Sequence, residues 1–571
     1  MPQTSDPFTN NLPGLILLIL IIAVPLAFMA SIGLLGLYRR AVIRAMRKRA
    51  NSGQIESEPP MISVQPKDVV QRPLNIAVLD SAFSLTTNSA PEGLYTSLLR
   101  GPWCAAAIYA VAGLCYALVM TTVFIAATDD GFYPIRFLVL FWYYAWPVVV
   151  TVCLVAAATW RMRFVVASIY FLILVLLAAI ALSRNSALNW GQIALLWLLT
   201  NFVAAVVLLA FLNRRIRAVG PIVLTFMIIA VTGSLLLPFI VGNDERLLRF
   251  IINFEVALWL GNYIFEGLVV LGFIIFGAIG WLMLQLIGGW YKRKKISEQS
   301  ITIDAIWLLF GIFQSIGLIF EGMRWFSASL FAFAVYKIVS WVGFSLLARQ
   351  RPSNRKNPNL MLLRVFSLGK RSERLFDALT MYWRYVGSIR LIAGPDLATT
   401  TMEPHEFLDF LSGKLARRFI DNAQTLDLRI SEMDVQPDYD GRFRVNDFFC
   451  YDDTWRMVLS RLVGESDVVL MDLRGFSSQN AGCIFEINEL INIVPLEQVV
   501  FISDDTTDGL FLRQVMQQSL DHMRSTSPNR LSKFRPLHLF HLKGLSDREL
   551  QRFLHILSIA ANAAPDAQAL A

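Results

Sequence analysis

Residues 12–37 are LPGLILLILIIAVPLAFMASIGLLGL, an apolar run without a single charged side chain. A helix needs about 20 apolar residues to cross a hydrocarbon core of ~30 Å, so this run is long enough to span a membrane. No Lys or Arg precedes it, whereas Arg39, Arg40 and Arg44 follow it closely. Because a cleaved signal peptide carries its positive charge before the apolar run, we expect a retained transmembrane helix with the N-terminus outside.

Eight further apolar segments are long enough to cross a membrane as helices. They are Trp103–Ala127, Ile135–Ala158, Phe164–Leu182, Trp190–Leu212, Pro221–Val241, Gly267–Trp290, Ile303–Phe320 and Phe326–Leu347. Alternating the nine spans from an outside N-terminus puts 22 Lys and Arg residues of the flanks on one side and five on the other. Positive charge favours the cytoplasmic side. The sequence therefore predicts a multi-pass protein of the plasma membrane, a bacterial inner membrane by preference, with its C-terminal part in the cytoplasm.

The composition of the whole chain agrees with a membrane protein. Hydrophobic residues make up 55% of the 571 residues and charged residues 16%, with a mean hydropathy of +0.53, whereas soluble domains carry about 25% charged residues. A fully soluble protein is excluded. The net charge of +8 divides into +3 for residues 1–102, +6 for 103–347 and −1 for 348–571. Since the excess lies beside the apolar segments, it indicates membrane topology, and nucleic acid is not the indicated partner.

These patterns divide the chain into five parts. Residues 1–49 hold the first span and its basic flank, and residues 50–102 form a cytoplasmic linker that contains several prolines. Residues 103–347 hold the other eight spans. We interpret residues 348–385 as a connector and 386–571 as a cytoplasmic α/β domain. Within the linker, only Leu74–Leu79 resembles a strand.

Two segments near the seventh span carry signals of their own. Arg249–Phe265 mixes aromatic with polar residues, which suits the headgroup level, so we expect an interfacial helix there. In the seventh span, Gly272, Gly277 and Gly280 predict a close contact with another helix, because small residues let two helix backbones approach.

Lys337 lies near the middle of the ninth span. An ionisable group at that depth costs several kcal/mol unless it is paired or extends to the headgroups. Glu255, Glu266 and Glu321 are candidate partners. Two hypotheses follow: Lys337 belongs to a pore, pocket or coupling element, or it extends to the cytoplasmic headgroups.

The C-terminal part alternates short apolar runs with amphipathic segments, which predicts a flavodoxin-like parallel sheet with helices on both faces. We expect strands at Ile389–Ala393, Leu426–Glu432, Val468–Leu473, Val499–Ser503 and Leu537–Leu542. We expect helices at Phe376–Val386, Pro404–Ile420, Thr454–Val463, Cys483–Ile493, Gly509–Met523 and Asp547–Ala560. Ligands of such sheets bind outside the carboxyl ends of the strands.

Polar residues stand at several of these strand ends. Gly394 and Asp396 follow the first expected strand, and Asp472 and Arg474 end the third. The fourth is followed by an acidic cluster, 504–508, whose two threonines favour a turn and a helix start over a cation site. No G-x-G-x-x-G follows the first strand and no G-x4-G-K-[ST] occurs, which argues against a dinucleotide-binding dehydrogenase and a P-loop NTPase.

The cysteines and histidines do not form a recognisable metal or disulfide pattern. The five cysteines contain no C-x-x-C pair, and all five histidines lie at or beyond His405 without a ligand spacing. We therefore expect neither a disulfide framework nor a catalytic metal site.

Residues 466–471, SDVVLM, followed after a turn by residues 480–487, NAGCIFEI, resemble the TIR (Toll/interleukin-1 receptor) domain. In that family a strand is followed by the pattern S-x-W-C-x-x-E-L, which opens the next helix. Cys483 and Glu486 keep the spacing of the pattern, whereas Asn480, Gly482 and Ile487 stand where Ser, Trp and Leu are usual. The resemblance covers residues 386–563, and it implies a TIR-like fold for that part of the chain.

The resemblance also implies an activity. In enzymatic members the glutamate of the pattern takes part in cleaving the nicotinamide–ribose bond of NAD, and this role falls on Glu486. A carboxylate suits that chemistry because breaking an N-glycosidic bond develops positive charge on the ribose. Gly394, Asp396, Asp472, Arg474 and Asn480 would then contact the nucleotide. NAD is expected as a substrate, with neither a resident cofactor nor a metal.

Three functions remain open from the sequence. The first is a membrane-anchored signalling or defence protein that acts as an NAD(P)+ glycohydrolase. The second is a non-enzymatic receptor or scaffold whose TIR-like domain binds partners by domain–domain contact, with the Gln436–Phe449 loop in the contact. We expect homo-oligomers that form through the membrane domain and the TIR-like domain. The third is a transporter or channel with a regulatory cytoplasmic domain. Glu486 has an alternative role as a favourable charge in a first helical turn, and Cys483 as a packed thiol.

Overall fold

A computed structural model describes most of the chain. The described residues are 7–48, 78–79, 92–128, 131–156, 160–184, 189–202, 204–205, 219–253, 263–319, 321–322, 325, 327–350, 357–365, 370–393, 403–451, 453–530 and 537–563. They form two compact units, one helical and one α/β. The helical unit comprises residues 1–38, 105–350 and 402–412, and the α/β unit comprises the rest.

Eight helices of the described residues are long and apolar enough to cross a membrane. They are α1 (Pro7–Lys48), α2 (Glu92–Thr128), the consecutive pair α3 (Pro134–Tyr144) and α4 (Trp146–Val155), α5 (Trp160–Arg184), α8 (Gly220–Asn243), α11 (Ile264–Lys292), α12 (Glu298–Ile319) and α13 (Ala328–Arg349). They correspond to eight of the nine predicted spans. The remaining prediction, Trp190–Leu212, begins as α6 (Trp190–Trp197) and the π-helical η2 (Leu198–Phe202), and most of its second half lies outside the described residues.

Local chemistry sets several boundaries in the helical unit. The third predicted span is interrupted at Ala145, because Pro147 lacks the backbone N–H that a continuous helix would use. The interfacial helix expected at Arg249–Phe265 corresponds in part to α9 (Glu245–Ile252), which begins where the Asp244 side chain accepts hydrogen bonds from two backbone N–H groups. Residues 254–262 of that segment lie outside the described residues.

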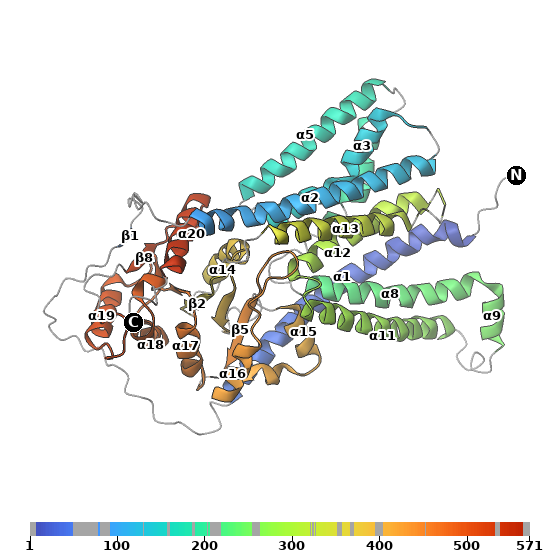
Figure 1. Cartoon of the computed structure of the whole chain (residues 1–571). Helices are drawn as coiled ribbons and strands as arrows, with labels where there is room; N and C mark the ends of the chain where they lie inside the picture. The colour runs from blue at the N-terminus through green and yellow to red at the C-terminus, as the bar shows by residue number, and fades with distance from the viewer. Residues whose placement is uncertain are drawn as a thin grey trace. The chain divides into compact units, whose positions relative to one another are not determined.

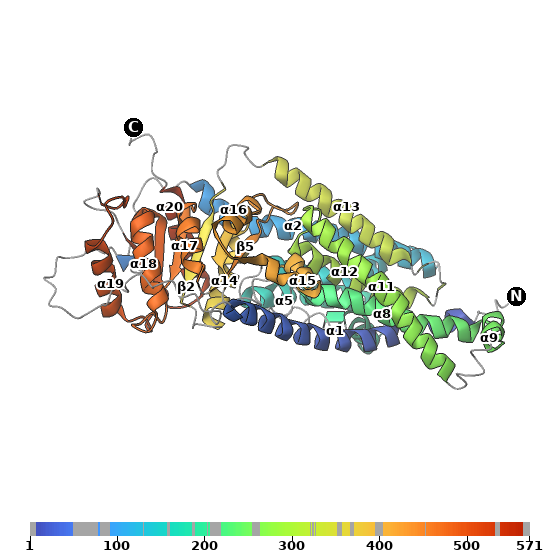
Figure 2. The ribbon, with the colours of Figure 1, turned by 90° about the horizontal axis from the view of Figure 1, so that it is seen from below.

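Helices α8 and α11 lie side by side, as Figures 1 and 2 both show. A Cβ atom added at Gly272 would lie 2.2 Å from the carbonyl oxygen of Gly233, so the two backbones touch there. At Gly280 the added atom would lie 3.0 Å from the ring of Phe226. The predicted close helix contact is confirmed at these two glycines, whereas Gly277 has room for a side-chain atom, with Phe226 4.0 Å away.

Gly272→Ala is expected to destabilise the helical unit by about 1–3 kcal/mol, the usual cost of forcing an extra carbon into a packed contact. The new methyl group meets backbone, which cannot rotate away as a side chain can. Thermal unfolding of the full chain in detergent measures the effect. Gly277→Ala on the same helix is the matched control, and an equal loss from both variants would contradict the close contact.

The α/β unit contains a sheet in which every pair of neighbouring strands is parallel, in the order β1-β8-β7-β6-β2-β3-β5-β4. The strands are β1 (Val78–Leu79), β2 (Leu360–Arg364), β3 (Ile389–Ile392), β4 (Phe419–Ile420), β5 (Val445–Cys450), β6 (Val468–Asp472), β7 (Val499–Ser503) and β8 (His538–His541). The helices are α14 (Lys370–Trp383), α16 (Ala423–Ser431), α17 (Trp455–Gly464), α18 (Ala481–Ile493), α19 (Gly509–Asp521) and α20 (Asp547–Asn562).

The sheet is covered by helices on both faces, as predicted. Side chains of successive strand residues point to opposite faces, and in β2 Met361 and Leu363 belong to one hydrophobic core while Leu360 and Leu362 belong to the other. Helices α17, α18 and α19 supply the first core, and α14, α20 and the beginning of α2 supply the second. Strands β2, β3, β6 and β7 are buried on both faces, which explains their near-continuous apolar sequences.

The strand order differs from the flavodoxin-like order that we expected. Numbered from β2, the six central strands lie in the order 3-2-1-4-5-6, which is the dinucleotide-binding order, whereas flavodoxin-like sheets have 2-1-3-4-5. The first strand of this order, β2, lies in the segment 348–385 that we interpreted as a connector. The α/β unit therefore begins earlier than the predicted residue 386.

One strand prediction and one loop prediction were also wrong. Residues 426–431 of the predicted strand belong to helix α16, because Asn422 caps it by accepting a hydrogen bond from the backbone N–H of Thr425 at 2.9 Å. The predicted loop Gln436–Phe449 contains all of β5 except Cys450, and β5 pairs with β3 and β4. The polar residues Asn446 and Asp447 interrupt the apolar pattern of this strand.

One connection of the α/β unit belongs to the helical unit. The chain between β3 and β4 forms α15 (Pro404–Leu411), whose Phe410 contacts Tyr38 of α1 edge to face, with ring centroids 5.3 Å apart. His405 stacks on Tyr291 of α11 at 5.6 Å. Helix α15 is therefore packed among the membrane-type helices.

Candidate functional site

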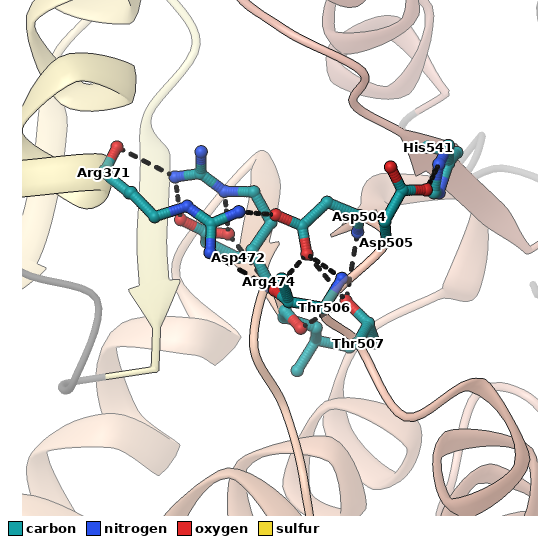
Figure 3. A network of polar contacts seen from close by, with 9 residues as sticks. Arg371, Asp472, Arg474, Asp504, Asp505, Thr506, Thr507 and His541 are labelled. Carbon is teal, nitrogen blue, oxygen red and sulfur yellow. Dashed lines mark hydrogen bonds and ion pairs between the residues drawn. The ribbon is translucent and has the colours of Figure 1, made fainter.

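The sheet has a switch point between β2 and β6, which are neighbours in the sheet but are followed by helices on opposite faces. Strand β2 leads to α14, and β6 leads to α18. Because the two connections leave in opposite directions, a crevice forms at the carboxyl ends of these strands, and this is where open α/β sheets bind ligands. Figure 3 shows the polar side chains at this edge.

Asp472 and Arg474, both predicted as site residues, bind each other at the end of β6. The guanidinium of Arg474 donates from Nε to Asp472 Oδ1 at 2.8 Å and from Nη2 to Asp472 Oδ2 at 2.7 Å (Figure 3). Arg474 Nη2 also donates to the backbone carbonyl of Arg371 at 3.1 Å. Both side chains are buried, so the pair is a buried bidentate ion pair. The hydrogen bond from Arg474 to Arg371 connects the end of β6 to the first turn of α14.

Arg371 and Asp504 form a second, more exposed pair across the crevice. The guanidinium of Arg371, in the first turn of α14, donates through Nη2 to Asp504 Oδ2 and through Nη1 to Thr506 Oγ1 (Figure 3). The Arg371 side chain is 48% exposed, whereas that of Asp504 is 8% exposed. The other oxygen of Asp504 accepts from the backbone N–H and the hydroxyl of Thr506 at 3.0 and 2.6 Å.

The charge state of Asp504 follows from these contacts. Burial raises the pKa of its carboxyl, but the hydrogen bonds from Thr506 and the nearby cations Arg371 and Arg474 together lower the pKa below its ordinary value. Asp504 is therefore ionised at neutral pH. The following residues form a turn and a helix start, as predicted, with Asp508 capping α19 by accepting from Phe511 N–H at 3.0 Å.

A set of ionisable groups is buried beneath this edge of the sheet. Arg364 ends β2, and Glu486 and Cys483 lie on α18, each less than 5% exposed. Burial raises the pKa of Glu486 to about 8, although the positive charge of Arg364 opposes the shift. Glu486 Oε2 has no hydrogen-bond partner among the described residues. Burial also raises the pKa of the Cys483 thiol, with Glu486 and Asp472 adding to the effect, which agrees with a packed and unreactive thiol.

The other predicted site residues are not brought into this network. Asn480 lies beside α18, where its side-chain oxygen accepts from the backbone N–H of Ser477 at 2.9 Å and so holds its own loop. Gly394 and Asp396 lie outside the described residues. Arg371 and Arg364 were not predicted as site residues because strand β2 was not predicted. The sequence indicates this strand by a short apolar run after Pro358 that ends in an arginine.

The described residues contain no group of three or more His, Cys, Asp or Glu side chains that could hold a metal ion. His541 Nε2 lies 3.0 Å from Asp505 Oδ1 near the end of β8 (Figure 3), which gives a single pair at the edge of the network. The charged side chains that meet in the network are guanidinium and carboxylate groups, with the imidazole of His541 at its edge.

Comparisons of the chain with family models, with curated proteins and with solved structures find no match. The resemblance to the TIR domain therefore rests on residues 466–487 alone. Any function has to be argued from the geometry of the two units.

Proposed function

We propose that this is a multi-pass membrane protein whose α/β unit binds a nucleotide at the switch point between β2 and β6. The observation that carries the proposal is the position of Arg371, a half-exposed guanidinium in the first turn of the helix that follows the first strand. In sheets of this strand order, that helix start is where phosphate groups of nucleotides bind. The partial positive charge of a helix N-terminus adds to the charge of the arginine.

The contacts of Arg371 suggest how a phosphate would enter. Its guanidinium now binds Asp504, which keeps hydrogen bonds to Thr506 when the pair is broken. A phosphate can replace the carboxylate of Asp504 because a guanidinium binds both anions with the same bidentate geometry. Asp504 would then be available to accept hydrogen bonds from ribose hydroxyls. Ser372, also in the first turn of α14, is buried with a hydroxyl that has no partner among the described residues.

Arg371→Ala is expected to weaken nucleotide binding about 10- to 100-fold, because a hydrogen-bonded contact to a charged group contributes about 1.5–3 kcal/mol. Titration calorimetry of the full chain in detergent with ATP, NAD and inorganic phosphate provides the measurement. Arg552→Ala is the matched control, since Arg552 is equally exposed at 51% and pairs with Glu549 on α20. Unchanged affinity of Arg371→Ala, or failure of the wild-type chain to bind any nucleotide, would refute the proposal.

Cleavage of NAD by Glu486 is a separate hypothesis with weaker support. It needs an ionised carboxylate that reaches the ribose, whereas Glu486 is 3% exposed and its pKa of about 8 keeps it neutral at pH 7. The same nucleotide titrations, followed by chromatography for free nicotinamide, test it directly. Release of nicotinamide by the wild-type chain and not by Glu486→Ala would establish the cleavage.

We propose a location in the plasma membrane with the α/β unit on the cytoplasmic side. The support is the excess of Lys and Arg in the flanks assigned to that side. A lipid bilayer is then the first partner of the helical unit. Homo-oligomer formation and a signalling or defence role rest on the TIR resemblance, and mass measurement of the detergent-solubilised chain tests the first of these.

A further inference from the structure

The helical unit holds an ion pair between two of its candidate spans. Lys337 Nζ of α13 lies 2.8 Å from Asp304 Oδ2 of α12. Lys337 thus pairs with Asp304, which was not among the predicted partners Glu255, Glu266 and Glu321, and Glu255 lies outside the described residues. Lys337 is nine residues from the start of α13 and twelve from its end. Charge at that depth in a membrane is costly, and it marks functional positions in membrane proteins.

The ion pair leaves one oxygen of the carboxylate unused. Asp304 Oδ1 is buried and has no hydrogen-bond partner among the described residues. A pair that served only to join two helices would be expected to satisfy both oxygens, since an unpaired buried acceptor is costly. The side chains of Lys337 and Asp304 are partly buried, 33% and 18% exposed. Stability alone does not explain such a pair either, because well-packed apolar residues are often as stable as a buried ion pair. The free oxygen therefore points to something that Asp304 binds.

Further polar groups continue from the pair along the buried side of α12. One turn after Asp304, the ring of Trp307 packs between Tyr336 and Tyr116, with centroid distances of 5.0 and 4.8 Å. The indole N–H of Trp307 is buried and has no acceptor in the described part of the chain. The hydroxyl of Tyr116 donates to Gln314 Oε1 at 3.1 Å.

This line of polar groups ends at the π-helical segment η2. Gln314 Nε2 donates to Asn201 Oδ1 at 3.4 Å, and Asn201 is fully buried within η2. A π-helical turn inside an α-helix often marks a functional site. The described residues thus place uncharged polar groups of α2, α12 and η2 on one side of the ion pair.

The elements packed around α12 and α13 supply few other titratable side chains. In their described parts the groups other than arginine and lysine are Tyr38 on α1, Tyr95, Tyr109, Tyr116, Cys104 and Cys115 on α2, Tyr143 and Tyr144 on α3, Cys153 on α4 and Tyr336 on α13, with Glu92 at the start of α2 and Glu298 at the start of α12. The basic residues are Arg39, Arg40, Arg44, Arg47 and Lys48 on α1, Arg100 on α2, Arg136 on α3 and Arg349 on α13. Tyrosine and cysteine ordinarily titrate above pH 8. Between pH 5 and 8, a proton that enters this part of the unit therefore has Asp304 as its natural acceptor.

We propose that Asp304 is a proton-exchange site within the membrane. A proton from water forms an O–H bond with the free Oδ1, the carboxylate becomes a neutral carboxylic acid, and its ion pair with the ammonium group of Lys337 is lost. Because this ion pair joins α12 to α13, proton uptake favours a rearrangement of α13 against α12. Proton binding is thereby linked to the conformation of the helical unit, independently of any nucleotide bound to the α/β unit.

Infrared difference spectroscopy of the full chain in lipid nanodiscs, between pH 8 and pH 5, tests the proposal. The wild-type chain is expected to gain the carbonyl band of a carboxylic acid in apolar surroundings, and Asp304→Asn is expected to lose that band. Glu266→Gln is the matched control, because Glu266 is an exposed carboxylate in the first turn of a neighbouring span. Persistence of the band in Asp304→Asn, or its absence from the wild-type chain, would overturn the assignment.

Lys337→Met provides a second test that does not depend on the folding of Asp304→Asn. Removing the ammonium group leaves an uncompensated buried carboxylate, which is expected to take up its proton already at pH 8. The band should then be present at both pH values and vanish from the difference spectrum, although it remains in the absolute spectrum. A Lys337→Met chain that still gains the band between pH 8 and pH 5 would show that the acid is not the partner of Lys337.

Discussion

Asp472→Ala is expected to lower the free energy of unfolding of the α/β unit by about 3–5 kcal/mol, the cost of removing one partner of a buried ion pair. The variant leaves the guanidinium of Arg474 buried with one remaining contact, to the backbone carbonyl of Arg371. It also removes the carboxylate that holds the Arg474 side chain in place at the end of β6. Thermal unfolding of the full chain in detergent should show one transition shifted strongly, and that shift identifies the transition of the α/β unit.

A double variant separates the charge from the packing. In Asp472→Ala combined with Arg474→Met, neither charge of this pair remains, so most of the lost stability should return. Glu549→Ala, which breaks an exposed pair with Arg552, should cost less than about 1 kcal/mol. If the double variant is as unstable as Asp472→Ala alone, packing and not the ion pair holds this edge of the sheet.

Glu486→Gln is expected to stabilise the α/β unit at pH 8 and to change little near pH 4.5. The pKa of Glu486 is raised to about 8 by burial, so the folded chain holds a proton that the unfolded chain releases above its ordinary pKa of about 4.3. The wild-type chain therefore loses stability as the pH rises from about 4.5 towards 8, by roughly 1.4 kcal/mol for each unit of pKa shift. Glutamine cannot ionise, so this loss should disappear.

The measurement is the midpoint temperature of thermal unfolding of the α/β unit at several pH values between 5 and 8, for the variant and for the wild-type chain. Glu489→Gln on the same helix is the matched control, and its effect on stability should be opposite. Glu489 is buried, pairs with Arg524 and accepts a hydrogen bond from Ser460. Losing those contacts should destabilise the chain at every pH. A Glu486→Gln chain that is less stable than the wild type at pH 8 would mean that Glu486 is ionised and paired.

The apolar spans could be predicted because membrane length alone identifies them, and eight of the nine have counterparts in the described residues. Strands β3, β6 and β7 could be predicted because each is a short apolar run buried on both faces. Strand β8 could be predicted from the apolar residues Leu537, Leu539, Phe540 and Leu542 in and next to it, although it is largely only partly buried. Strand β5 could not, since Asn446 and Asp447 break its pattern. In α16, the alternation Leu426, Leu428, Ile430 favoured a strand, and the cap formed by Asn422 favours the helix that is observed.

The candidate site was predictable only in part. Asp472 and Arg474 stand at the end of an obvious strand, so their polar character was visible in the sequence. Their mutual pair, and the role of Arg371, depend on β2 lying beside β6 across more than 100 residues of chain. Such long-range pairing leaves no local pattern, and the order of parallel strands cannot be read from any one of them. For the same reason Asp304 was not recognised as the partner of Lys337.

The packing of α15 among the membrane-type helices limits which fragments of this protein can be produced separately for biochemical work. A fragment that starts after α13 would retain α15 but lose α1 and α11, leaving Leu408 and Phe410 without the residues Gly288 and Tyr38 that they contact. It would also lack Leu94 and Leu98 from the second core and the edge strand β1. Such a fragment would expose apolar surface and aggregate, so purification should start from the intact chain in detergent or lipid.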